Sequence, residues 1–98
     1  MSLTIELNDS AEQTAFNLKR WAEVLADSEL ARLPHRIEAD RHGHILIEEK
    51  TALYFEAGAS EVWICEENGN IRFHFRTPPN IRQSSELCPE FPPAINVP

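Results

Sequence analysis

Four consecutive apolar residues, Val62-Trp63-Ile64-Cys65, constrain the fold of this chain more than any other feature of its sequence. A strand with one exposed face alternates apolar and polar residues, whereas an unbroken apolar run is typical of a strand covered on both faces. Such a strand needs a neighbouring strand along each edge and a layer of structure against each face. We therefore expect residues 61–66 to form a strand for which the rest of the chain supplies neighbours and cover.

The segment after this run predicts a β-hairpin. Asn68-Gly69 is the strongest hairpin signal in the chain, because both residues tolerate the positive φ that tight hairpin turns require. Beyond it, apolar and polar residues alternate, as in a strand with one buried face: Ile71, Phe73 and Phe75 against Arg72, His74 and Arg76. Arg72 and Arg76 are therefore candidate contacts for nucleic-acid phosphates. The alternative is that this basic stripe is only the solvated face of the strand.

Two helices are predicted. The first spans about residues 10–26, since Asp9 and Ser10 are good N-caps. Its apolar residues recur at helical spacing: Leu18, Trp21, Ala22 and Leu25. A short turn over residues 29–33 follows and ends at Pro34. The second helix spans about residues 48–57, because Glu48 and Glu49 suit its first turn and Gly58 suits its end.

The remaining segments complete an α+β fold. Residues 36–47 are predicted to form a hairpin with its turn at 40–43, and residues 1–8 form an N-terminal arm that either adds a strand or covers a groove. From Thr77 onward the chain is rich in proline, and this tail is ordered only if Leu87, Phe91 and Ile95 dock onto the domain. The predicted order is an N-terminal helix, a β-hairpin, a second helix, a two-stranded hairpin completing a small mixed sheet, and a Pro-rich C-terminal tail.

Length and charge limit the classes of function. The 98 residues suit a single domain, residues 1–98, with a core over 9–76 and the tail over 77–98. Nine Lys and Arg against sixteen Asp and Glu give a net charge of −7, which argues against nucleic acid as a partner. No apolar run is long enough to span a membrane, and the first residues do not resemble a signal peptide. We therefore expect a cytoplasmic protein that does not bind a membrane.

Metal and cofactor signatures are weak. Cys65 and Cys88 are predicted to be free thiols, because a lone pair of cysteines without an export signal is rarely a disulfide. His42 and His44 are spaced to meet a metal on one side of a strand, but no third ligand is near them in the sequence. We expect neither a cofactor nor a structural metal ion.

A longer pattern resembles a bacterial protein family. Its motifs are a Lys, a Tyr four residues later, a Gly-Ala pair and a Glu-Val-Trp entry into a core strand: Lys50, Tyr54, Gly58-Ala59 and Glu61-Val62-Trp63. The segment 36–45, which follows a capped helix, and the ending over 85–95 are also similar to that family. On these residues the chain resembles the restriction-endonuclease-like family of the PD-(D/E)XK nuclease superfamily.

The resemblance also implies that a central region is missing. Family members carry there an Asp on one strand and a Glu on the next, which bind a divalent metal for phosphodiester cleavage. Here Ile45-Leu46-Ile47 runs directly into Glu48-Glu49-Lys50, as if the head and foot of the family were joined. Lys50 matches the helix lysine of the family by position and is its vestigial catalytic candidate. The alternative is that Lys50 is a solvated residue of an amphipathic helix.

Three hypotheses about function remain open, of which the third is an ordinary interaction partner for another protein, unrelated to nucleic acid. In the first, the chain is a non-catalytic, internally truncated relative of these nucleases that acts by self-association or by binding a protein. The loss of central strands would leave the 62–65 strand with an open edge, which predicts a homodimer. In the second, it is a small Mg²⁺- or Mn²⁺-dependent DNA endonuclease with a site rebuilt from Lys50, Glu48, Glu49 and Asp40, within one chain or across a dimer. Glu48 and Lys50 would share a face if residues 45–50 formed one long strand.

Overall fold

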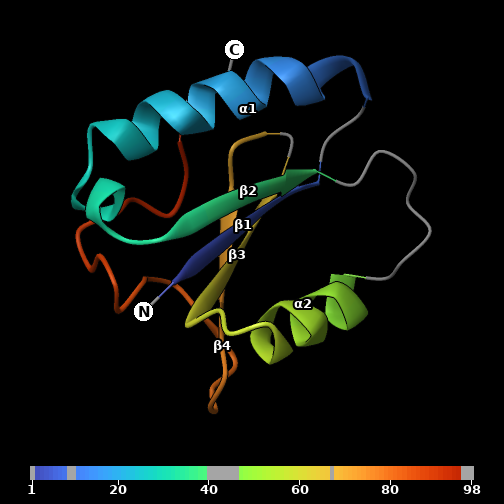
Figure 1. Ribbon diagram of the computed structural model, residues 1–98, viewed down its shortest axis with the longest axis vertical. Coiled ribbons are helices and arrows are strands. Elements are labelled where there is room, and N and C mark those ends of the chain that lie inside the picture. The colour runs from blue at the N-terminus through green and yellow to red at the C-terminus, as the bar shows by residue number, and fades with distance from the viewer. Residues whose placement is uncertain (1, 9–10, 40–46, 67, 96–98) are drawn as a thin grey trace.

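The computed structural model describes residues 2–8, 11–39, 47–66 and 68–95 of the chain (Figure 1). Its elements are β1 (Leu3–Asn8), α1 (Ala11–Ala26), the 3₁₀ turn η1 (Glu29–Arg32), β2 (His35–Ala39), α2 (Ile47–Glu56), β3 (Glu61–Glu66), β4 (Ile71–Phe75) and β5 (Ile81–Arg82). The predicted α+β class is confirmed, and so are both helices and the strand over 61–66.

The five strands form one mixed sheet in the order β2-β1-β3-β4-β5. β1 pairs in parallel with β2 and with β3, and β3 and β4 form the predicted antiparallel hairpin. Figure 1 shows α1 across one face of the sheet and α2 against the other. β3 therefore has a strand on each edge and a helix over each face, as its unbroken apolar run requires.

In the first half of the chain, one of the two alternatives for the N-terminal arm is confirmed and the predicted hairpin is corrected. The N-terminal arm is strand β1 inside the sheet, because Leu3, Ile5 and Leu7 alternate and all three are buried. Of the predicted hairpin over 36–47, the first strand is confirmed as β2, whereas its pairing and the place of Ile47 differ from the prediction. β2 pairs in parallel with β1. The chain between the two strands contains α1, and parallel neighbours require a long crossover connection of this kind. Ile47 begins α2, and the predicted turn lies outside the described residues.

Alternation along the strands divides the interior into two parts. Leu3, Ile5, Trp63 and Phe73 belong to the large core under α1, together with Trp21 and Leu25 of that helix. The opposite face of the sheet carries a smaller cluster of Ala59, Val62 and Ile64, on which Tyr54 and Phe55 of α2 pack. The α2 side is thus thinner in apolar residues, and it is the side on which the charged candidates lie.

The Pro-rich tail docks on the α1 side. Phe91 stacks on Trp21 with ring centroids 6.0 Å apart and lies 4.7 Å from the Trp63 ring. Phe91 and Ile95 are buried in the core, and Leu87 packs partly against it. The condition that the sequence set for an ordered tail, namely the docking of these three residues, is met. The two-residue strand β5 was not predicted from the sequence.

Glycine ends α2 as predicted. Gly58 has φ of 108°, and the N–H groups of Gly58 and Ala59 donate to the carbonyls of Phe55 and Tyr54. This left-handed cap suits glycine because a Cβ disfavours that conformation. The cap turns the chain directly into β3, and it fixes α2 close to the sheet.

Candidate functional site

Lys50 lies under α2 and contacts the sheet. Its Nζ is 2.7 Å from Oε1 of Glu6 on β1, an interior strand that lies between β2 and β3. The side chain of Glu6 is 1% exposed and that of Lys50 is 12% exposed, so this ion pair is almost wholly buried. The expectation that Lys50 is a solvated helix residue is therefore wrong. Its ammonium group is committed to a buried carboxylate, a pairing that a buried charge requires.

Tyr54 completes this cluster from the next turn of α2. Its hydroxyl donates to Oε2 of Glu6 at 2.7 Å, and its position four residues after Lys50 places both side chains on one helix face. Burial, together with the hydrogen bond to Glu6, raises the pKa of the Tyr54 phenol well above its usual value. Each oxygen of the Glu6 carboxylate therefore has a donor from α2.

Glu38 lies beside this cluster on the neighbouring strand. Glu6 and Glu38 are register partners in the parallel pair of β1 and β2, so they occupy the same face of the sheet. Glu38 forms an ion pair with Arg36, with Nε to Oε1 at 3.1 Å, and both side chains are substantially exposed. The α2 side thus holds two carboxylates on adjacent strands and one lysine from the covering helix.

Of the other residues of the predicted catalytic site, only Glu49 has a side chain that the structure describes. Glu49 is exposed on α2, Glu48 lies in the first turn of the same helix, and Asp40 falls outside the described residues. The long strand that would have aligned Glu48 with Lys50 is absent, because Ile47–Glu56 is a helix. Sequence analysis missed Glu6, although the buried alternation of its neighbours would have placed it on the opposite face of β1.

Arg72 and Arg76, the candidate phosphate contacts, bind groups of the chain itself. Arg72 donates to Oε1 of Glu66 at 2.8 Å. Arg76 donates from Nε to the carbonyl of Ala59 at 2.9 Å and from Nη2 to the carbonyl of Phe55 at 2.5 Å. Arg76 thereby ties the end of β4 to the C-terminal cap of α2, which gives it a structural role.

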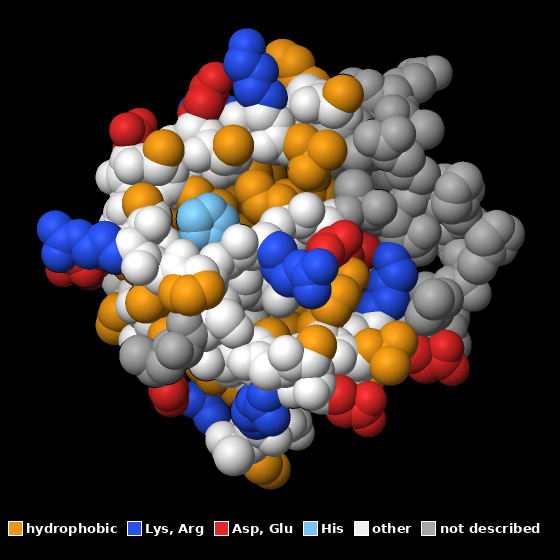
Figure 2. All heavy atoms as spheres, in the orientation of Figure 1, with side chains coloured by type: hydrophobic (Ala, Val, Ile, Leu, Met, Phe, Trp, Pro, Cys, Tyr) orange, Lys and Arg blue, Asp and Glu red, His pale blue; other side chains and the backbone are white. Residues whose placement is uncertain are grey.

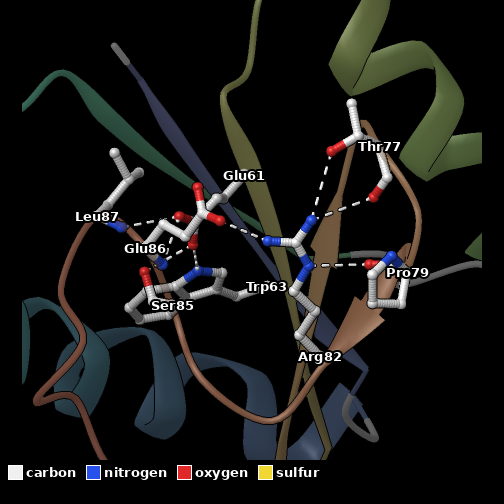
Figure 3. A network of polar contacts seen from close by, with 8 residues as sticks. All are labelled: Glu61, Trp63, Thr77, Pro79, Arg82, Ser85, Glu86 and Leu87. Atoms are coloured by element: carbon white, nitrogen blue, oxygen red, sulfur yellow. Dashed lines mark hydrogen bonds and ion pairs between the residues drawn. The ribbon is translucent and has the colours of Figure 1, made fainter.

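A second buried carboxylate, Glu61, organises the tail at the edge of the α1 core (Figure 3). Its Oε1 accepts from Trp63 Nε1 at 2.9 Å and from Ser85 Oγ at 2.6 Å. Its Oε2 accepts from the backbone N–H groups of Glu86 and Leu87 at 3.0 and 2.8 Å. Groups of this chain thus donate four hydrogen bonds to the Glu61 carboxylate, and three of them attach the tail to β3.

A pocket of about 280 Å³ opens beside the Glu6 cluster. It lies between the starts of β1 and β2 and the C-terminal half of α2, and Thr4, Arg36 and Tyr54 contribute to its wall. Within the described ranges, no group of three or more His, Cys, Asp or Glu side chains is placed to hold a metal ion. Cys65 and Cys88 are free thiols.

Comparison with protein-family models, curated proteins and solved structures finds no match for this chain. The nuclease resemblance consequently remains a prediction. Among the residues that the structure describes, none of the helices is long and apolar enough to cross a membrane.

Proposed function

We propose that this protein acts by binding a protein partner, its own second copy included, and that it does not hydrolyse phosphodiesters. One observation argues against hydrolysis: Lys50 and Tyr54 occupy both oxygens of the buried Glu6 carboxylate. A lysine that assists metal-dependent cleavage must be available to the attacking water or the scissile phosphate. Here its removal from Glu6 would leave a carboxylate buried without its counter-charge, which is costly. The binding of a partner is supported by β2, which is an edge strand of the described sheet.

The cluster has a sufficient structural role. α2 packs on the sheet through few apolar residues, mainly Tyr54 and Phe55 against Val62 and Ile64. The Glu6–Lys50–Tyr54 contacts add two charge-assisted hydrogen bonds at the same surface, and such bonds are stronger than neutral ones. Stabilisation of the fold therefore explains why one lysine and one tyrosine lie on the same face of α2, with no reaction required.

A plasmid-nicking assay tests the proposal. The wild-type chain is incubated with supercoiled DNA and Mg²⁺ or Mn²⁺ beside an EDTA control, and no nicking above that control is expected. Lys50→Ala and Glu6→Gln are run in parallel, with Lys19→Ala as a control because Lys19 is exposed on α1. Metal-dependent nicking that persists in Lys19→Ala and disappears in the other two variants would overturn the proposal.

The second candidate function is metal-dependent DNA cleavage at the same place. It is favoured by the position of Glu6 and Glu38, which neighbour each other on adjacent strands beside Lys50. Two such carboxylates would hold one Mg²⁺ or Mn²⁺ ion, whose role would be to activate water. Binding of Mn²⁺ to the folded state would raise Tm. Under this candidate, Glu38→Gln abolishes the Mn²⁺-dependent rise in Tm, whereas the exposed control Glu49→Gln retains it.

A further inference from the structure

The two edges of the sheet differ in how open they are to another strand. At one edge, β5 has only two residues, and very short edge strands resist pairing. At the other edge, β2 runs for five residues, and among the described residues no strand lies beyond it. Figure 2, in the orientation of Figure 1, shows a mixture of basic, acidic and hydrophobic side chains over the visible face of the molecule, without one dominant type.

In β2, the backbone N–H and C=O groups of every second residue point outward, where another strand could pair with them. Leu3 N–H donates to the carbonyl of Pro34 at 3.0 Å. This bond shows which residues beside and within β2 direct their backbone groups toward β1. Because N–H and C=O groups alternate in direction along a strand, residues 34, 36 and 38 face β1. The backbone groups of His35, Ile37 and Ala39 consequently face outward at the open edge.

The charged side chains of β2 are complementary to those of a second copy of β2 that runs antiparallel to it. Arg36 and Glu38 flank Ile37 and lie on one face of the strand. If two copies pair antiparallel about Ile37, Arg36 of each chain lies opposite Glu38 of the other. These are the positions between hydrogen-bonded pairs, where the side chains of opposite residues are closest. Ile37 faces its own copy at the two-fold axis.

We infer that β2 is a homodimerisation edge, at which two chains pair antiparallel about Ile37 into one continuous sheet of ten strands. The outward backbone groups of His35, Ile37 and Ala39 supply the hydrogen bonds, and two Arg36–Glu38 pairs set the register. A two-fold arrangement satisfies both edges at once and leaves no open β2 edge for further growth. This inference rests on the proposed function and names its partner as a second copy.

Charge exchange tests the register directly. Arg36→Glu and Glu38→Arg each place like charges opposite each other in two positions, so each variant should dimerise roughly tenfold more weakly or worse. An equimolar mixture of the two variants restores opposite charges at both positions, and a heterodimer of near wild-type affinity is expected. Arg32→Glu and Glu56→Arg carry the same charge changes at exposed positions away from β2. Their self-association should match wild type.

The measurement is sedimentation equilibrium over a wide concentration series, with reductant present and circular dichroism to verify that each variant is folded. A wild-type chain that remains monomeric at every concentration would overturn the inference, and so would a mixture of Arg36→Glu and Glu38→Arg that fails to associate. Neither result bears on the absence of cleavage. Conversely, metal-dependent nicking would overturn the proposed function and leave the β2 pairing intact.

Discussion

The Nζ of Lys50 lies 2.7 Å from Oε1 of Glu6, and this contact joins α2 to the interior strand β1 across 44 residues of sequence. Both partners are nearly inaccessible to water, so the pair differs from the exposed ion pair of Arg36 with Glu38. Exposed pairs contribute little to stability, whereas the loss of one partner from a buried pair leaves an uncompensated charge. The first prediction follows from this difference.

Lys50→Met should lower the free energy of unfolding by about 3–5 kcal/mol, because it leaves the Glu6 carboxylate buried without its cation. Urea unfolding measures the change. Lys19→Met, at an exposed position of α1, should change it by less than about 0.5 kcal/mol. The double variant Glu6→Gln with Lys50→Met should be more stable than Lys50→Met alone. If the two lysine variants unfold alike, the ion pair does not hold α2 on the sheet.

Tyr54 is the single tyrosine of the chain, so its ionisation can be followed by ultraviolet absorbance without interference from another phenol. Since burial and the Glu6 hydrogen bond raise its pKa, the folded protein should show no tyrosinate at the pH near 10 where free tyrosine ionises. Glu6→Gln, which removes the negative charge, should lower the pKa of Tyr54 toward that value. An unperturbed titration in the wild-type chain would contradict the contact.

The same shift predicts how stability depends on pH. The folded state holds the Tyr54 proton more tightly than the unfolded state does, so the unfolded chain loses it first as pH rises. The contribution of Tyr54 to the free energy of unfolding is therefore constant below about pH 10 and falls above it. Tyr54→Phe removes this alkaline slope, and it costs about 1.5–3 kcal/mol at neutral pH because a hydrogen bond to a charged group is lost. Denaturant unfolding at a series of pH values measures both effects.

Glu61→Gln should release the tail. The substitution keeps the size of the side chain but turns an amide NH₂ toward donors, either Trp63 and Ser85 or the N–H groups of residues 86 and 87. A buried donor without an acceptor costs about 1–3 kcal/mol. Limited proteolysis should then cut within residues 77–95 faster than in wild type. Glu90→Gln, an exposed change in the same tail, should leave the cleavage rate unaltered.

Phe91→Ala should destabilise the domain by about 3–5 kcal/mol, because the ring fills the space between Trp21 and Trp63 in the α1 core. The two tryptophans of the chain are these same residues, so their fluorescence spectrum should shift as water reaches them. Phe16→Ala provides the matched control, since that ring is 51% exposed. Equal stability of the two variants would mean that the tail is not part of the core.

Local sequence patterns were sufficient for most individual elements. The apolar run at 62–65, the Asn68-Gly69 turn, the capped first helix and the Gly58 stop each correspond to an element whose boundaries depend on nearby residues. Composition also identified Phe91 as one of the residues that must dock if the tail is ordered, because a Pro-rich tail gains order only through its few apolar residues. These features were predictable because hydrophobic periodicity, helix caps and turns depend only on residues close together in the sequence.

Apart from the hairpin of β3 and β4, strand pairing was decided by the tertiary structure. Nothing near Leu3–Asn8 in the sequence indicates that it enters the sheet between β2 and β3, and this insertion is what brings Glu6 to Lys50 and Tyr54. It also gives β3 the neighbour that the hypothesis of an open edge had assigned to a second chain, and it moves the open edge to β2. A pattern of alternating residues specifies which face is buried, but it carries no information on which strand lies alongside. The candidate site is therefore a product of long-range pairing, and only Lys50 and Tyr54, which share one helix face, could be placed together from the sequence.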